Sequence, residues 1–328
     1  MRVLLVKTSS MGDVVHALPL VTDLAAHVPG IVIDWVVEEG FADIARLHPA
    51  VRRVIPVALR RWRRAMLRPA TWREVEAARA SVRGAYDAAL DCQGLLKSAW
   101  VAHWAGCPIY GYDRDSAREP LAARLYRRGF AVPRDLHAIA RNRTLGAAAF
   151  RYTADGAPGF GLRVGVPHRD AAALVQRPFA MLLTNASRPT KLLPDAHWHA
   201  LADALAARGL RCVLPWGSEA ERADTERRAA TMRDACVAPR LSLAALAPVL
   251  GAARVVIGID TGLTHLAAAV AAPTVGVFCD YDPRLVGVTG DAPCANVGDG
   301  SGVPAVEEVL AGLEQVLASP PDQQKRVS

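Results

Sequence analysis

The stretch RVLLVKTSSMGDVVHALP, residues 2–19, decides how the fold of this chain is interpreted. An apolar run ends at Val6, and a polar loop then leads through Gly12 and a single carboxylate, Asp13, into apolar residues at helical spacing. A short buried strand followed by a loop and a helix begins a βαβ unit. Because ligands of parallel sheets gather where the strands end, this loop is a candidate site.

The same alternation continues along the chain. Apolar runs that predict strands occur at residues 2–6, 31–37, 53–57, 87–91, 178–184, 211–216, 254–260 and 274–278. Stretches with helical spacing lie between them. Strands that alternate with helices indicate parallel sheets covered on both faces, so we expect an α/β fold with doubly wound sheets.

A change in composition near residue 170 divides the chain. Gly165 and Pro167 interrupt the pattern there, and a new apolar run begins at Phe179. The chain has 328 residues, more than the roughly 100–200 residues of an ordinary domain. We therefore expect two domains, at residues 1–168 and 169–328, with a substrate cleft between them and a last helix that could pack back on the first domain.

Composition excludes several classes of protein. The chain is 52% hydrophobic and 22% charged, which is too apolar for a disordered chain, yet no apolar stretch reaches the roughly 18–20 residues of a membrane span. The start has no small-residue cleavage site, so we expect a cytoplasmic protein or one on the cytoplasmic face of a membrane. Six scattered cysteines without CxxC spacing predict reduced core residues and no metal site.

Two interpretations of Asp13 are open. It could cap the helix that follows, which stabilises a helix by about 1 kcal/mol. It could also act as a general base, because the loop lacks the glycine patterns of dinucleotide and phosphate-binding loops. If Asp13 is a base, we expect Ser9, Ser10 and Gly12 of the same loop to bind the acceptor molecule from which it removes a proton. We also expect Pro19 to interrupt the helix.

The stretch VVIGIDTGLTHLAAA, residues 255–269, predicts a nucleotide site. A buried strand leads through the DTG sequence directly into an Ala-rich helix. Thr261 or Thr264 can cap this helix, and amides around Gly262 and Leu263 can bind a diphosphate. An ordinary turn between a strand and a helix is the alternative.

Two further loops suit a nucleotide. The loop after the strand at 178–184 supplies Ser187 and Lys191, which could neutralise a leaving diphosphate. The loop after the next strand supplies Glu219 or Glu221, either of which could accept hydrogen bonds from a ribose. Each loop could instead be an ordinary solvated segment.

Positive charge is concentrated in one part of the chain. Eight arginines and no acidic residue lie between Pro49 and Arg73, and the net charge is +7. Such a run can be a solvated face, bind nucleic acid, or pair with phosphates and carboxylates of an anionic lipid. The acceptor-binding residues predicted on this last interpretation are Arg60, Arg61, Arg63, Arg64 and Arg118. Gln93 and Lys97, which follow the strand at 87–91, are further candidates for contact with the acceptor. The same charge would attract the protein to an anionic membrane, by about 1 kcal/mol per basic residue near the surface.

The chain resembles the family-9 glycosyltransferases. The matching motifs are KTSSMGDVVHALP (7–19), DWVVEEGF (34–41), VIPVALRRWRR (54–64), DCQGLLKSA (91–99), AREPLA (117–122), LPWGSEAE (214–221) and DTGLTHL (260–266). The resemblance implies a GT-B architecture of two Rossmann-like domains facing a cleft. It also implies inverting, metal-independent transfer of L-glycero-D-manno-heptose from ADP-heptose to the Kdo of Kdo2-lipid A, at the cytoplasmic face of the inner membrane.

The resemblance also implies roles for single residues. Asp13 would be the general base, Lys191 and Ser187 would bind the diphosphate, Glu221 would bind the ribose, and Leu241 would lie near the adenine. The other residues of the donor pocket would be Asp260, Thr261, Gly262 and His265. No cofactor, metal or nucleic acid is implied. The chain departs from the family pattern at residues 186–190, which replace a threonine pair.

Two other functions share parts of this pattern. An NAD-dependent oxidoreductase should carry a glycine fingerprint after its first strand, and this chain does not. A non-catalytic nucleotide-binding protein would keep the donor site without turnover, and the sequence by itself leaves that alternative open.

Overall fold

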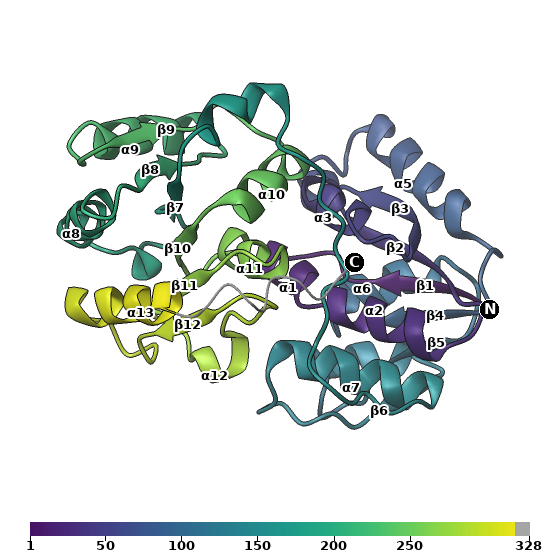
Figure 1. The fold of residues 1–328 in the computed structure, drawn as a ribbon. Helices are drawn as coiled ribbons and strands as arrows, with labels where there is room; N and C mark the ends of the chain where they lie inside the picture. Colours follow the sequence, from purple (N-terminus) through teal and green to yellow (C-terminus); the bar gives the residue numbers. More distant parts are fainter. Residues whose placement is uncertain (319–328) are drawn as a thin grey trace. The chain divides into compact units, whose positions relative to one another are not determined.

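The computed structural model of the protein describes residues 1–318, which form parts of two compact units that divide between Leu162 and Arg163. The boundary expected at residue 168 lies slightly later in the chain. Each unit is built on a parallel sheet with helices on both faces (Figure 1). This architecture confirms the α/β, doubly wound fold predicted from the alternating pattern.

The first sheet has the order β3-β2-β1-β4-β5-β6 among the described residues. Its strands are β1 (Arg2–Val6), β2 (Val32–Glu38), β3 (Val51–Val57), β4 (Ala88–Asp91), β5 (Ile109–Tyr112) and β6 (Arg128–Phe130). The chain moves outward from β1 on one side and then crosses to β4, which pairs with the other edge of β1. The strand order therefore reverses between β1 and β4.

Two layers of helices cover the first sheet. On one face, α2 (Leu18–His27) packs against α7 (Ala138–Phe150). The elements that share the core of the other face are α4 (Leu59–Arg64), α5 (Pro69–Val82), α6 (Leu96–His103) and the short 3-10 helix η2 (Pro120–Leu125). The remaining elements are α1 (Met11–Val15), η1 (Glu39–Phe41) and α3 (Ala42–Arg46).

The helix after β1 is interrupted, as Pro19 predicts. The short α1 ends at Val15, and α2 begins at Leu18 with the proline as its second residue. A proline fits there because the first amides of a helix have no intrahelical partner. The break keeps the first turn, with Asp13, in a short helix of its own.

The second sheet has the order β12-β11-β10-β7-β8-β9 among the described residues. Its strands are β7 (Phe179–Leu183), β8 (Arg211–Leu214), β9 (Ala235–Val237), β10 (Val255–Ile259), β11 (Thr274–Val277) and β12 (Cys294–Val297). Counted from its own first strand, this order is the same as in the first unit. The reversal falls between β7 and β10, which pair in parallel.

The helices of the second unit also form two layers. The helices that share the core with Trp198 are α8 (Asp195–Ala206), α9 (Glu219–Ala229) and α13 (Val306–Ala318). The other longer helices are α10 (Leu243–Ala252) and α11 (Gly262–Ala269), which contact each other. The short elements are η3 (Arg169–Leu174), η4 (Pro189–Lys191) and α12 (Pro283–Val286). Among the described residues the last helix is α13, which packs on β11 and β12.

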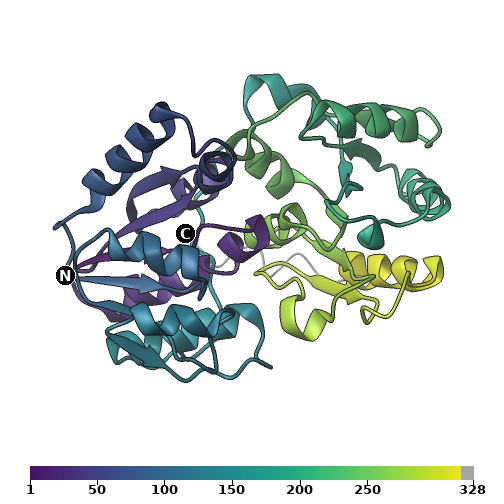
Figure 2. The ribbon, with the colours of Figure 1, turned by 180° about the vertical axis from the view of Figure 1, so that it is seen from behind.

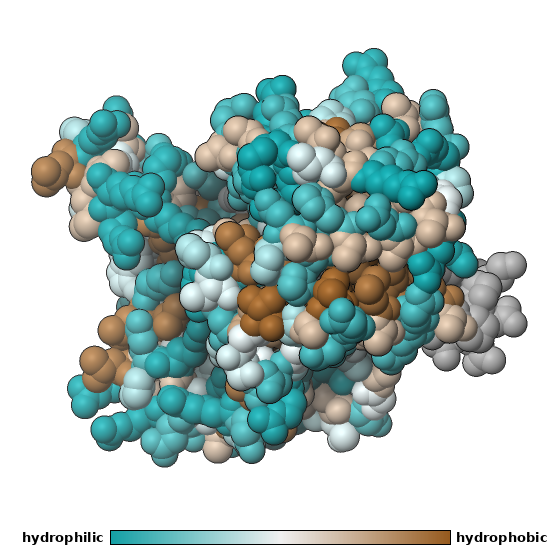
Figure 3. Space-filling view, turned by 90° about the vertical axis from the view of Figure 1, so that its left-hand side faces the viewer, coloured by the Kyte–Doolittle hydropathy of each residue, from teal (hydrophilic) through white to brown (hydrophobic). Residues whose placement is uncertain are grey.

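Polar and apolar residues are distributed as in a globular protein. Figure 3 shows one face on which hydrophilic residues predominate and apolar residues gather in small groups. All six cysteines are free thiols, but the predicted core position holds only for Cys92, Cys212 and Cys279, because Cys107, Cys236 and Cys294 are only partly buried. Within residues 1–318, no helix is long and apolar enough to cross a membrane, and no group of three or more His, Cys, Asp or Glu side chains could hold a metal ion.

Candidate active site

The loops after β1 and β4 meet where the first sheet reverses its strand order. Lys7 Nζ donates to the Cys92 carbonyl (2.9 Å), and both the amide and the hydroxyl of Thr8 donate to Gln93 Oε1 (2.7 Å each). Lys97 Nζ lies 3.4 Å from Ser9 Oγ. The predicted residues Ser9, Gln93 and Lys97 are therefore together. Gln93 is buried and its oxygen is already occupied, so it positions this loop.

Asp13 lies in the first turn of α1, and its two oxygens have different surroundings. Oδ2 accepts hydrogen bonds from the amide (2.8 Å) and hydroxyl (2.9 Å) of Ser10. Oδ1 lies 3.8 Å from Lys7 Nζ and 3.7 Å from a guanidinium nitrogen of Arg118, beyond hydrogen-bond distance. One oxygen thus holds the helix start, and the other can accept a proton. The structure confirms that Asp13 helps to cap the helix. Oδ1 remains available for the alternative role of general base.

Arg118 reaches Asp13 because its loop packs over Gly94. The Glu119 amide donates to the Gly94 carbonyl (3.0 Å). Gly94 has a φ of +71°, and a Cβ there would lie 3.2 Å from Tyr112 and 3.3 Å from the Arg118 amide. A larger residue would push this loop away. The glycine after β4 therefore helps to set the distance between the arginine and the carboxylate.

The charges around Asp13 keep it ionised. Burial alone would raise the pKa of its carboxyl, but Lys7, the Ser10 amide and Arg118 more than offset that effect, so the pKa lies below its usual value. A carboxylate with a low pKa is fully available at neutral pH. It takes a proton from a hydroxyl only as that hydroxyl becomes acidic during bond formation.

The arginine cluster is split between structural and free side chains. Arg61 pairs with Glu39 (3.2 Å) and Glu74 (2.9 Å), which ties α4 to neighbouring elements. Arg60 lies over the Phe41 ring at 5.9 Å. Arg63 and Arg64 are exposed, and neither forms an ion pair within residues 1–318. These last two are the arginines of the cluster that remain available for an anion.

The second unit has a charged group at the same point of its sheet. Lys191, after β7, donates to the Asp260 carbonyl (2.9 Å) and also to the carboxylate of Asp260, which follows β10. His265 Nε2 lies 3.3 Å from Asp260 Oδ1. Burial would raise the pKa of Asp260, but His265 and Lys191 more than offset it, so the pKa is lowered. Lys191, Asp260 and His265, each predicted to bind the donor, therefore lie together.

The N-terminus of α11 begins directly beside this group. Thr261 occupies the N-cap position, but its side chain makes no capping bond. Thr264 is buried and its hydroxyl donates to the Ile259 carbonyl (2.6 Å), which ties the helix to β10. Within the described residues, the amides of Gly262 and Leu263 have no hydrogen-bond acceptor. Such amides and the helix dipole can bind an anion.

The loop between β7 and α8 adds further polar groups. Ser187 is exposed on it. Asp280, after β11, accepts a hydrogen bond from Thr190 and lies 3.5 Å from an Arg188 nitrogen. The other oxygen of Asp280 is buried without a partner among the described residues. The sequence analysis missed Asp280, because it follows a strand without a recognisable motif.

The two acidic candidates after β8 differ in the structure. Glu221 closes a capping box at the start of α9, where its Oε2 accepts from the amides of Gly217 (2.8 Å) and Ser218 (3.0 Å). Glu219 points to Arg222 at 3.7 Å and is largely exposed. Glu221 is thus the carboxylate fixed at the end of the strand, and its other oxygen makes none of these bonds.

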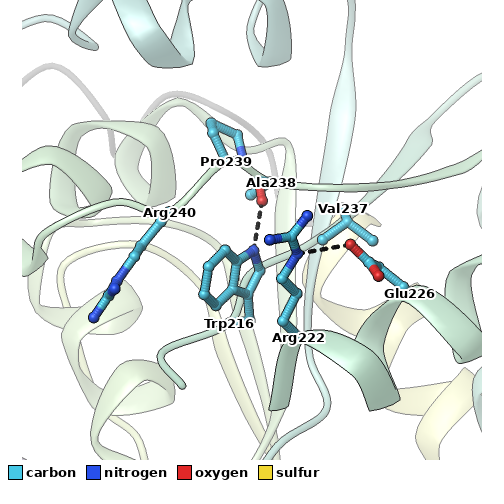
Figure 4. Close-up of a pocket in the computed structure, with 7 residues that line it drawn as sticks. All are labelled: Trp216, Arg222, Glu226, Val237, Ala238, Pro239 and Arg240. Atoms are coloured by element: carbon cyan, nitrogen blue, oxygen red, sulfur yellow. Dashed lines mark hydrogen bonds and ion pairs between the residues drawn. The ribbon is translucent and has the colours of Figure 1, made fainter. Parts of the chain in front are cut away.

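A pocket lies beside these residues, between the ends of β8 and β9 (Figure 4). Its volume is about 560 Å³, and its lining residues are Trp216, Arg222, Glu226, Val237, Ala238, Pro239 and Arg240. The Trp216 indole donates to the Ala238 carbonyl (2.9 Å), with Arg222 and Arg240 at 5.4 and 5.9 Å from its ring. Leu241 is the next residue after this wall. The sequence analysis missed the pocket; the Trp in LPW, directly after a strand, was the available signal.

Two Rossmann-like sheets, each with charged loops at its reversal point, are the architecture of GT-B glycosyltransferases. The chain belongs to glycosyltransferase family 9 (heptosyltransferase), whose model matches residues 75–300, and it is therefore a glycosyltransferase. This membership removes the oxidoreductase and the non-catalytic binding protein as alternatives.

Curated relatives and solved structures agree with the family. Lipopolysaccharide heptosyltransferase 1 of Pseudomonas aeruginosa is 48% identical over 90% of this chain and 85% of its own. The Escherichia coli protein of that name is 42% identical over 88% of this chain and 90% of its own. E. coli heptosyltransferase WaaC has been solved with ADP; it is 38% identical, with a TM-score of 0.84 over 96% of this chain and 99% of that one. A second WaaC structure, with ADP-2-deoxy-2-fluoro heptose, has a TM-score of 0.82 at 37% identity, over the same shares of both chains.

Proposed function

We propose that the protein transfers L-glycero-D-manno-heptose from ADP-heptose to the Kdo of Kdo2-lipid A, with inversion and without a metal ion. The observation that carries this proposal is the Asp13 carboxylate, ionised and with one oxygen free of hydrogen bonds, in a chain whose curated relatives are lipopolysaccharide heptosyltransferases. We place the reaction at the cytoplasmic face of the inner membrane, where the protein binds peripherally.

Asp13 acts as the general base. In a single displacement with inversion, one carboxylate removes the proton of the acceptor hydroxyl while that oxygen attacks the anomeric carbon. Asp13 Oδ1 is the atom that takes the proton, because Oδ2 is held by Ser10. Lys7 and Arg118 keep the carboxylate ionised until the acceptor arrives.

The second unit binds the donor and stabilises the leaving group. Lys191 is held at the start of α11 by Asp260, so its ammonium group and the free amides of Gly262 and Leu263 converge on one region. The departing diphosphate gains negative charge as the glycosidic bond breaks, and preorganised positive groups stabilise that charge. These protein groups supply the charge that a divalent cation would otherwise supply. Ser187 adds a hydroxyl from the same loop as Lys191.

The pocket at Trp216 suits the adenosine. Its indole offers a flat apolar surface for a purine, and Glu221, at the start of the neighbouring helix α9, has a carboxylate oxygen for the ribose hydroxyls. Leu241 directly follows Pro239 and Arg240 of the pocket wall, which supports its assignment near the adenine.

The acceptor is anionic, and the first unit offers cations for it. Arg63, Arg64 and Lys97 are exposed, and guanidinium groups pair with carboxylates and phosphates in a bidentate way. Arg64→Ala should therefore raise the acceptor KM and leave the Kd of ADP unchanged. Arg61→Ala is a less direct test, because it also removes the ion pairs to Glu39 and Glu74.

One assay tests the proposal as a whole. The purified protein, mixed with ADP-heptose and Kdo2-lipid A, should release ADP and increase the mass of the lipid by one heptose. The reaction should proceed unchanged in EDTA, and NMR of the product should show the anomeric configuration opposite to that of the donor. Release of ADP without a heptosylated lipid would contradict the assignment of the acceptor.

A further inference from the structure

We propose that one face of the first unit docks directly on an anionic lipid surface, with apolar side chains entering the lipid boundary and arginines at the phosphates. The docking face is defined here as the outer surface of the loop between α4 and α5, the start of α5, α6 and η2. The proposal deepens the membrane association stated above and rests on the proposed function for the identity of the membrane.

Large apolar side chains are concentrated on this face. Of the twelve that are exposed within residues 1–318, seven belong to the docking face. Leu67 is 100% exposed; Met66 (52%) precedes it, and Trp72 (53%) follows five residues later in the first turns of α5. A contiguous set of exposed apolar residues in a globular protein marks an interaction site.

The exposed side chains at the α4–α5 loop are held in place. The Thr71 hydroxyl donates to the Ala65 carbonyl (2.8 Å), and the Trp72 indole donates to the Met66 carbonyl (2.7 Å). Two hydrogen bonds from the start of α5 therefore fix the backbone of the preceding loop at Ala65 and Met66. Leu67, which lies in that turn, is presented to solvent by a fixed backbone.

A second apolar group lies on α6 and η2. Leu96 and Trp100 are one helical turn apart on α6, 42% and 47% exposed. Trp100 packs edge-on against buried Trp104, with ring centroids 4.8 Å apart. On η2, which contacts α6, Leu121 and Leu125 are 52% and 41% exposed. Docking on a lipid surface explains the exposure of Trp100.

Both groups lie on the same side of the first sheet. Buried residues of α4, α5, α6 and η2 form one core with β1: Trp62, Val82, Val101 and Ala122 pack in it together with Leu4. Figure 2 shows α6 in front of this sheet, and α5 contacts the edge strand β3. A single surface can therefore bring both groups to one flat partner.

Unpaired arginines flank both apolar groups. Arg63, Arg64, Arg68 and Arg73 lie beside the first, and Arg124 and Arg127 beside the second. Within residues 1–318, none of these six forms an ion pair, whereas Arg61 is held by Glu39 and Glu74. Their positive charge is therefore available to a partner.

The combination identifies a lipid surface as the occupant. Aliphatic side chains such as Leu67 gain free energy in the acyl boundary, tryptophans favour the interface, and arginines pair with lipid phosphates. Nucleic acid would use the arginines but offers no apolar volume for leucine and methionine. No helix within residues 1–318 can cross a membrane, so the protein would lie on the bilayer.

Vesicle binding tests the proposal. The wild-type protein should sediment with vesicles that contain phosphatidylglycerol, at least about tenfold more tightly than with pure phosphatidylcholine, and added salt should weaken binding. The double variant Leu67→Ser/Trp100→Ser should bind the anionic vesicles roughly tenfold more weakly or worse. Brominated lipids should quench part of the wild-type tryptophan fluorescence.

A matched control separates docking from general loss of apolar surface. Val166 and Val303 are 87% and 46% exposed in the second unit. The variant Val166→Ser/Val303→Ser removes apolar surface there and should bind vesicles as the wild type does.

Turnover separates docking from catalysis. With a deacylated, water-soluble acceptor, Leu67→Ser/Trp100→Ser should keep wild-type kcat and KM, which also shows that it is folded. Equal vesicle binding by this variant and the wild type would overturn the proposal, as would loss of turnover on the soluble acceptor. If the wild type transfers heptose but does not bind vesicles, the docking proposal and the peripheral membrane binding are wrong, and the assignment of heptose transfer stands. Loss of DNA binding by the same variant, without vesicle binding by the wild type, would assign the face to nucleic acid.

Discussion

At the reversal point of the first sheet, one oxygen of Asp13 is held by Ser10 and the other lies 3.7–3.8 Å from two cations. At the same point of the second sheet, both oxygens of Asp260 are engaged, by Lys191 and His265. A carboxylate lies at the reversal point of each sheet, and the side chains around it determine what it can do. A carboxylate with an open oxygen can take a proton, whereas one with both oxygens engaged can only orient its partners.

Asp13→Asn tests this comparison with the largest expected effect. The amide keeps the size of the side chain but cannot accept the acceptor proton, so kcat should fall by about 10²–10⁴. The Kd of ADP, measured by calorimetry, should be unchanged because the donor groups lie in the second unit.

Asp43→Asn is the matched control for this experiment. Asp43 is a surface carboxylate of the same unit that pairs with Arg46 at 2.8 Å. Its substitution should leave kcat within about twofold of the wild type, since surface ion pairs contribute little. If Asp13→Asn retained a near wild-type kcat, the role of Asp13 as the base would be wrong.

Lys191→Ala tests the other side of the comparison. Loss of the ammonium group removes the main cation beside α11 and should weaken ADP binding by about 10–100-fold. Lys191→Arg should recover part of the affinity because it retains the charge. Asp260→Asn should show a smaller loss, because it only releases the lysine from its position. An unchanged Kd of ADP in Lys191→Ala would exclude a contact between this lysine and the diphosphate.

Glu221→Gln distinguishes the two acidic residues after β8. We expect ADP to bind several-fold more weakly to this variant, about 1 kcal/mol or less, because a charged acceptor for the ribose becomes neutral. Glu219→Gln is the control and should bind ADP normally. The decisive ligand is 2′-deoxy-ADP: it should bind the wild type more weakly than ADP does, and this difference should shrink in Glu221→Gln. A difference of equal size in both proteins would remove Glu221 from the ribose.

Arg118→Ala should change the pH dependence more than the maximal rate. The guanidinium lowers the pKa of Asp13, so its removal raises that pKa and the carboxylate becomes protonated at a higher pH. The acid limb of kcat, measured at saturating acceptor, should therefore move to higher pH. At neutral pH, kcat should change by less than about twofold, because Asp13 stays ionised. A limb that stays in place would show that another group controls it.

Eight strands, among them the edge strand β3, were predictable from the sequence, whereas the edge strands β6, β9 and β12 and the neighbouring β5 were not. The runs at β1, β2, β3, β4, β7, β8, β10 and β11 contain enough buried β-branched and aliphatic residues to be recognised. The sequence analysis missed β5, β6, β9 and β12, which have three or four residues each. Segments such as RGF in β6 become strands because a neighbouring edge is already in place, which a local pattern does not reveal.

Residues of the candidate site could be predicted where a charged side chain belongs to a motif that directly follows a strand. Asp13, Lys191 and Asp260 are such cases, and the structure places each at a sheet reversal. Their partners come from elsewhere in the chain: Arg118 reaches Asp13 through packing over Gly94. Spacing in the sequence gives no information on such contacts between distant segments. The same limit explains why the pocket at Trp216 was missed, because its lining comes from the loop after β8, from α9 and from the end of β9.

The central position of β1 has a consequence for synthesis on the ribosome. One edge of β1 can pair with β2 soon after synthesis, but the other edge can pair only after β4, which begins at Ala88, has been synthesised. During that interval the nascent chain carries an apolar strand with an unpaired edge, which is prone to aggregation. The same delay recurs when β7 waits for β10, at Val255. We therefore expect this polypeptide to need chaperone protection twice during translation, once for each sheet.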